Sequence, residues 1–116
     1  GAAFARTVGA MTGRALPAEP LPVALGRAAA GLGLPVEEVV AHYLHALASQ
    51  LVQVAVRFVP LGQTEGQRML AELHPVILGV AQEAQGLSLD SVTGSAFGAD
   101  RASMAHETLE VRIYRT

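Results

Sequence analysis

The stretch PVEEVVAHYLHALASQLVQVAVRF, residues 35–58, is the most informative part of this sequence for the fold class. Its apolar side chains recur every three or four residues, a spacing that places them on one face of an α-helix. Glu38, His42 and His45 lie among the polar residues on the opposite side. We therefore expect a long amphipathic helix that begins at Pro35 and ends near Phe58. Its predicted apolar face consists of Val36, Val40, Tyr43, Leu47, Leu51, Val54 and Phe58.

Two further sets of side chains on this helix predict helix–helix packing. Small side chains allow a neighbouring helix to approach closely, and the alanines that provide them are Ala41, Ala46, Ala48 and Ala55. Three apolar side chains lie beside the predicted apolar face and must be buried by a separate contact: those of Val39, Leu44 and Val52. We expect another chain, or sequence upstream of this one, to bury these three side chains.

Proline and glycine divide the remainder of the chain. Residues 16–22 contain three prolines, which a helix interior does not tolerate, so we expect a loop there. Further helices are expected over residues 2–12, 22–30, 64–86 and 99–108, and Pro75 should kink or break the third of them near His74. The sequence thus predicts one all-α domain over residues 1–116, a bundle of about five helices with a flexible C-terminal tail.

The segment VPLGQTEGQ, residues 59–67, predicts a helix end, a tight turn and a new helix. Pro60 ends the first helix, and Gly62 is expected to adopt a positive φ in the turn. Thr64 is the predicted N-cap of the following helix, with Gln67 as its capping-box partner.

Gly66 is not explained by this turn. A glycine within a helix costs up to about 1 kcal/mol relative to alanine. Its presence in the first turn of the predicted helix indicates either close backbone packing or the approach of a partner at this point.

Composition excludes several functional classes. A formal net charge of −2, with eight basic and ten acidic residues, argues against nucleic-acid binding. The absence of cysteine excludes disulfides, thiolate metal sites and a cysteine nucleophile, and it fits a reducing cytoplasm. Polar residues interrupt every apolar stretch, so no membrane span is expected. Charged residues make up only 16%, against about 25% in ordinary soluble domains, which favours an exposed apolar surface that meets a protein partner.

No arrangement typical of catalysis is found, so the protein is not expected to be an enzyme or to need a cofactor. The sequence lacks a GxSxG elbow, a Walker loop, an HExxH motif and a dinucleotide-binding fingerprint. Glu38, His42 and His45 could place three metal ligands on one helix face. Since ligands from a single helix leave half of the coordination shell empty, a solvated polar face is the favoured interpretation.

Three separated motifs resemble the UreF family of urease accessory proteins. VRFVPLGQTEGQRML, residues 56–70, is similar to the family's long helix that ends in VPLGQT-x-GQ. Upstream, LPVALGRAAAGLGLPVEEVVAHYLHAL resembles the family's segment at the same position, and GADRASMAHETLEVRIYRT resembles its ending. The resemblance covers residues 21–116 and implies a C-terminal part of such a protein, with the family's N-terminal half missing.

The resemblance also implies a function. Family members are expected to be all-helical, cytoplasmic homodimers that act in nickel insertion into urease by bridging UreD (UreH) and the GTPase UreG onto apo-urease. The alternative is a helical nickel-binding chaperone that acts alone through Glu38, His42 and His45. The partner-binding positions implied by the resemblance are Pro60, Leu61, Gly62, Gln63, Thr64, Gly66, Gln67, His106, Glu107, Arg112, Tyr114 and Arg115.

Overall fold

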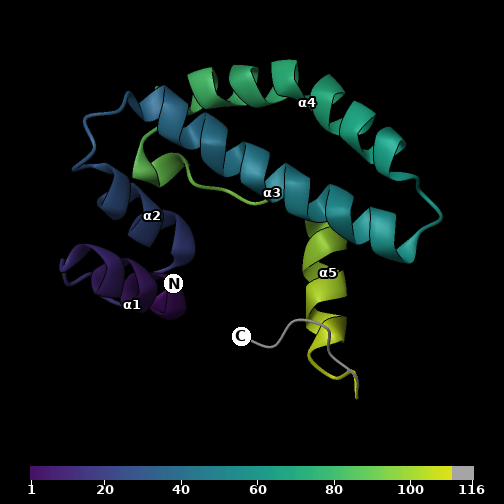
Figure 1. Ribbon diagram of the computed structural model, residues 1–116, viewed down its shortest axis with the longest axis horizontal. Helices are drawn as coiled ribbons and strands as arrows, with labels where there is room; N and C mark the ends of the chain where they lie inside the picture. Colours follow the sequence, from purple (N-terminus) through teal and green to yellow (C-terminus); the bar gives the residue numbers. More distant parts are fainter. Residues whose placement is uncertain (111–116) are drawn as a thin grey trace. The chain divides into compact units, whose positions relative to one another are not determined.

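The computed structural model describes residues 1–110, and within them the secondary structure is entirely helical (Figure 1). The predicted all-α fold class is confirmed. Arg112, Tyr114, Arg115 and the rest of the predicted flexible tail from residue 111 on lie outside the described residues. The elements are α1 (Ala2–Thr12), α2 (Leu21–Ala29), α3 (Val36–Phe58), α4 (Gln63–Ala84), the short 3-10 helix η1 (Leu89–Ser91) and α5 (Phe97–His106).

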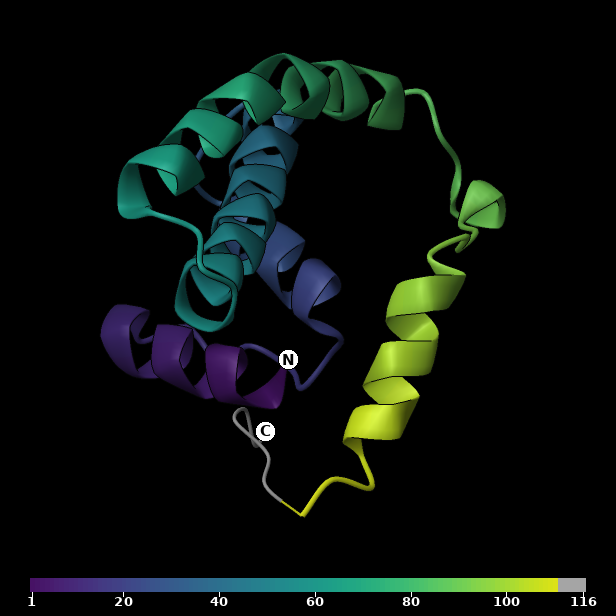
Figure 2. The same ribbon diagram turned by 90° about the vertical axis from the view of Figure 1, so that its right-hand side faces the viewer.

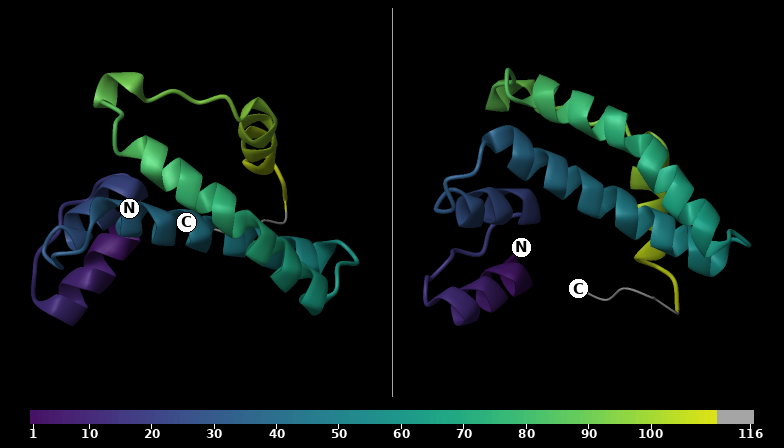
Figure 3. Two further views of the ribbon diagram at one scale, coloured as in Figure 1. Left: turned by 90° about the horizontal axis from the view of Figure 1, so that it is seen from above. Right: turned by 45° about the horizontal axis from the view of Figure 1, so that its top comes forward.

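The chain divides into two units, Gly1–Gly86 and Leu87–Thr116, each of which is described by itself. Within the first unit, α3 and α4 form an antiparallel hairpin and lie side by side along their lengths (Figures 1 and 3). The rings of His45 and His74 meet midway along this pair, with centroids 5.2 Å apart. At the end distant from the connecting turn, Gln85 Nε2 donates a hydrogen bond of 3.1 Å to Glu37 Oε2. These two contacts show the antiparallel register of the two helices.

The face of α3 that meets α4 differs from the predicted apolar face. Val52 is buried, with 6% of its surface exposed, although it was expected to need cover from outside this chain. By contrast, Leu47, Leu51 and Phe58 are 45%, 64% and 58% exposed. Because α4 carries a glycine opposite Val52, the closest approach lies on the side of α3 rich in small residues. The other two flanking side chains, Val39 and Leu44, are half-buried.

Helix α4 continues through Pro75 without a break. Figure 3 shows that α4 changes direction along its length while it remains helical. A proline inside a helix removes one hydrogen bond and costs about 3 kcal/mol or more. Leu70 and Ile77 are buried on either side of Pro75, so the packing of both halves of α4 offsets that cost. Of the two predicted outcomes near His74, a kink or a break, the structure has no break.

Helices α1 and α2 pack against each other through small side chains, and Ala5 and Ala24 are their buried residues. Gly13 ends α1 in the left-handed conformation, with φ 70°. The loop that follows is joined to α2 by Glu19, whose carboxylate accepts hydrogen bonds of 2.6 and 2.8 Å from Arg27. The expected loop before α2 is confirmed, and Pro22 lies in the first turn of that helix.

The second unit has little core of its own within its described part. Figure 2 shows η1 as a single turn in the segment that leads to α5. No residue from 87 to 110 is buried, and His106 at the end of α5 is the one that is half-buried in this range. Leu89 and Phe97 are 90% and 71% exposed. The final short helix expected over residues 99–108 is present as α5, and it begins and ends two residues earlier than expected.

Candidate functional site

The turn between α3 and α4 has a different geometry from the one predicted. Gly62 has φ −69°, so it does not adopt a positive φ, and it is the N-cap residue of α4. Its carbonyl accepts a hydrogen bond of 2.9 Å from the Gly66 N–H, so the N-cap lies two residues before the predicted one. Thr64 is therefore the second residue of α4, and no side chain caps the helix. Because the predicted cap position lies inside the helix, the assignment of Thr64 as an N-cap is wrong.

Gly66 is buried at the point of closest approach between α3 and α4. A β-carbon at this position would lie 2.8 Å from Val56 Cγ2 and 3.1 Å from Val52 Cγ1. Valine side chains have little rotational freedom in a helix, so these methyl groups have little room to move away. Close packing thus accounts for the glycine without a partner, which confirms the first of the two interpretations.

Most of the other predicted partner-binding residues of this turn are on the surface. Leu61 is half-buried, and the exposed residues are Pro60, Gly62, Gln63, Thr64 and Gln67. The adjacent Phe58 and Val59 are 58% and 57% exposed. The structure therefore brings an exposed polar turn and exposed apolar side chains together at one end of the hairpin.

The remaining predicted partner-binding residues belong to the second unit. His106 is the last residue of α5, and Glu107 follows it as the C-cap residue and is exposed. Arg112, Tyr114 and Arg115 lie outside the described residues.

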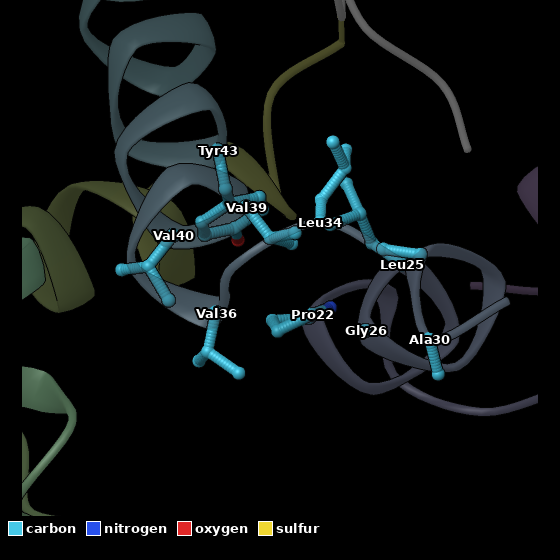
Figure 4. Close-up of a pocket in the computed structure, with 10 residues that line it drawn as sticks. Pro22, Leu25, Gly26, Ala30, Leu34, Val36, Val39, Val40 and Tyr43 are labelled. Atoms are coloured by element: carbon cyan, nitrogen blue, oxygen red, sulfur yellow. The ribbon is translucent and has the colours of Figure 1, made fainter. Parts of the chain in front are cut away.

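An apolar hollow of about 280 Å³ lies between α2 and the start of α3 (Figure 4). It was not predicted from the sequence, although its α3 wall comes from the predicted apolar face. A second hollow of about 460 Å³ adjoins it and is lined by α1, α2 and α3. The side chains that line the first hollow include Pro22, Leu25, Leu34, Val36, Val40 and Tyr43.

The structure does not bring Glu38, His42 and His45 together as a ligand set. His42 Nδ1 lies 2.7 Å from the backbone carbonyl oxygen of Glu38, and because a carbonyl only accepts, Nδ1 carries the proton. The ring of His45 instead lies beside His74 of α4, tilted by 44°. Among residues 1–110, no three histidine, aspartate or glutamate side chains are placed so that they could hold a metal ion.

One ion pair in the first unit shifts the pKa of both of its members. The hydrogen bonds from Arg27 hold the pKa of Glu19 below its usual value, and the same contacts raise the pKa of Arg27. Arg27 is 51% exposed, so solvent screens this interaction. The pair joins the loop to α2.

Helix α3 is long and apolar enough, by length and composition alone, to cross a membrane. This finding differs from the expectation that polar residues interrupt every such stretch, since the best 18-residue window has a mean hydropathy of 1.3. The same helix packs along one side against α4, through Val52 and His45.

A helical hairpin with exposed apolar side chains, and no metal-ligand set in its described part, is typical of proteins that bind other proteins. Comparison with known proteins identifies the protein family to which this chain belongs. The UreF family model matches residues 1–74, and the chain belongs to the UreF family of urease accessory proteins.

Curated relatives match over the whole of this chain. The urease accessory protein UreF of Cereibacter sphaeroides strain KD131 is 62% identical over 116 residues, which are 100% of this chain and 55% of the relative. The UreF proteins of Jannaschia sp. strain CCS1 and Paracoccus denitrificans strain Pd 1222 are 51% and 47% identical over the same length, covering 53% and 54% of those proteins. No solved structure matches. The chain thus spans about half the length of the curated relatives that it matches, and its expected place in the C-terminal part remains a prediction.

Proposed function

We propose that this protein is a non-catalytic scaffold in urease maturation, which bridges UreD (UreH) and the GTPase UreG onto apo-urease during nickel insertion. Its membership of the urease accessory family supports this proposal. The structural observation that best supports the scaffold role is the turn between α3 and α4, where an exposed polar segment adjoins exposed apolar side chains of α3. Such a combination of an apolar centre and a polar rim is typical of protein–protein interfaces.

The proposed binding surface consists of the turn and the adjacent end of α3. Phe58 and Val59 supply apolar contact area, while Gln63 and Gln67 can donate and accept hydrogen bonds at the rim. Gly62 has no atom within 4 Å of the position that a β-carbon would occupy, so the backbone there is open to an approaching partner. His106 and Glu107 of the second unit are proposed as a further contact with UreD or UreH.

Co-purification with the partner proteins tests the proposal. UreD (UreH) and UreG are expected to be captured by the wild-type protein, and the double variant Gln63→Ala and Gln67→Ala should reduce the captured amount about tenfold. Gln82→Ala is the matched control, because this exposed glutamine lies on the same helix far from the turn. Failure of the wild-type protein to capture either partner contradicts the scaffold role.

The assembly is proposed to act in the cytoplasm as a homodimer of the accessory protein. The absence of cysteine from the sequence fits a reducing compartment. Sedimentation of the purified protein, alone and with UreD (UreH), measures the number of copies in the assembly.

A further inference from the structure

The charged side chains of the α3–α4 hairpin are segregated toward its two ends. The end next to the turn carries two arginines, Arg57 and Arg68, with one carboxylate, that of Glu65. The first turns of α3 and the last turns of α4 lie together at the other end, because the helices are antiparallel (Figure 1). That end has no lysine or arginine on either helix, and its charged residues are Glu37, Glu38 and Glu83.

The helix dipoles explain only part of this segregation. A helix favours carboxylates in its first turn and cations in its last turn. Helix α3 follows this rule, with Glu37 and Glu38 at its start and Arg57 at its end. Helix α4 departs from it, because Glu83 lies in the last turn, which holds no basic residue. The hairpin therefore has a stronger contrast of charge between its ends than the helix dipoles account for.

Arg57 is the arginine at the turn end that can pair with another molecule. It is exposed, and it forms no ion pair with a carboxylate of residues 1–110. Arg68, by contrast, donates a hydrogen bond of 2.8 Å to Glu65 within α4. Arg57 also directly precedes Phe58 and Val59, which are 58% and 57% exposed. An unpaired cation thus lies next to exposed apolar surface in the chain.

We propose that Arg57 binds a carboxylate on an acidic surface of the partner protein that docks on the turn between α3 and α4. This inference deepens the proposed scaffold role and rests on it. A guanidinium group can donate two parallel hydrogen bonds to one carboxylate, and arginine is enriched in protein interfaces whereas lysine is depleted.

The opposite end of the hairpin adds to the selectivity. Glu37, Glu38 and Glu83 repel an acidic surface, so they direct such a partner toward the turn. Attraction at one end and repulsion at the other together set the orientation in which the partner binds.

Binding of the full chain to purified UreD (UreH) and to purified UreG, each measured by surface plasmon resonance, tests the inference. The partner that docks on the turn is the one whose binding the double variant Gln63→Ala and Gln67→Ala weakens. For that partner, raising NaCl from about 0.1 M to about 1 M should weaken binding at least about fivefold, because the Debye length falls from about 10 Å to about 3 Å.

Substitutions of Arg57 separate its charge from its shape. Arg57→Gln should weaken binding about tenfold at the lower salt concentration and remove most of the salt dependence. Arg57→Lys should keep the salt dependence but lose part of the affinity, since an ammonium group lacks the planar fork of donors. Arg68→Gln and Arg6→Gln are the matched controls, because Arg68 is already paired within α4 and Arg6 is exposed on α1. Each control should change binding less than about threefold.

The possible failures are distinguishable. If neither partner binds the wild-type protein, the scaffold role and this inference both fail. If the double glutamine variant weakens binding but Arg57→Gln and salt do not, the turn remains the docking site and the role of Arg57 is wrong. Equal losses from Arg57→Gln and Arg6→Gln would indicate an effect of net charge alone, which also contradicts the inference. Wild-type salt dependence decides the question even if a variant fails to fold, because salt-independent binding excludes a charge pair at this surface.

Discussion

Gly66 of α4 lies against Val56 of α3 so closely that a β-carbon on the glycine would be 2.8 Å from Val56 Cγ2. This contact sets the distance between the two helices at the end of the hairpin next to the turn. Val52, one helical turn earlier on α3, is buried at the same place. A glycine that is unfavourable for the helix is therefore compensated by packing that no larger residue would permit.

Gly66→Ala should destabilise the protein, although alanine is the better helix former. Alanine gains up to about 1 kcal/mol in helix propensity, whereas overpacking in a tight interface costs about 1–3 kcal/mol. Gly79→Ala is the matched control on the same helix, because no atom lies within 4 Å of the added β-carbon. Chemical denaturation should show a lower free energy of unfolding for Gly66→Ala and a higher one for Gly79→Ala.

A second substitution on α3 tests whether contact with Val56 is the reason that Gly66→Ala destabilises the protein. Val56→Ala removes the methyl group nearest to the added carbon, so the double variant Gly66→Ala and Val56→Ala should lose less stability than the two single changes added together. If the effects simply add, the contact with Val56 is not what limits the size of residue 66.

Thr64→Ala is expected to leave stability within about 0.5 kcal/mol of wild type, because Thr64 is exposed within the first turn of α4 and caps nothing. A true N-cap threonine would cost about 1 kcal/mol when replaced by alanine. Thermal melting distinguishes the two values. A loss of stability near about 1 kcal/mol would support Thr64 as the N-cap that the sequence predicted.

Leu51 and Val52 are adjacent on α3 but differ in exposure, 64% against 6%. Val52→Ala should cost roughly 1–2 kcal/mol, since it removes buried apolar surface and leaves a cavity against α4. Leu51→Ala should change the free energy of unfolding by less than about 0.5 kcal/mol. Equal costs in a denaturation experiment would mean that α4 packs on a different face of α3 in solution.

Acidification should release the contact between Glu19 and Arg27. The pKa of Glu19 is lowered below its usual 4.5 by the hydrogen bonds from Arg27, so the ionised carboxylate favours the folded state above that pH. This contribution is lost as the pH falls through the lowered value. NMR titration of the Glu19 carboxyl should give a midpoint below 4.5, and Arg27→Gln should move it upward. A midpoint unchanged by Arg27→Gln would contradict the pairing.

Residues 107–116 are predicted to be required for capture of UreD (UreH). Gly1–Gly86 forms a unit of its own, so a chain shortened by these ten residues should keep the circular dichroism of α1 to α4. Pull-down of UreD (UreH) by the shortened chain is the measurement. Capture at the wild-type level would show that this segment is not the binding element.

The helices and most of their limits follow from the sequence, because local features specify them. The three-to-four residue spacing from Pro35 to Phe58 predicted α3, and proline and glycine marked the loops before and after it. Backbone hydrogen bonds within a helix join residues that are four apart, so a short window of sequence contains the necessary information. The N-cap of α4 was misplaced by two residues because Thr64 satisfies a side-chain capping pattern, whereas the observed N-cap residue is Gly62, which has no side chain.

The pairing of helix faces required three-dimensional information. Hydrophobic periodicity selected the face with Leu47 and Leu51, but α4 lies on the face with Val52, because Gly66 allows closer contact there. The meeting of His45 with His74 has the same origin: it depends on the register of two antiparallel helices. Such a register results from steric complementarity between residues distant in the chain, and no local pattern in either helix encodes it.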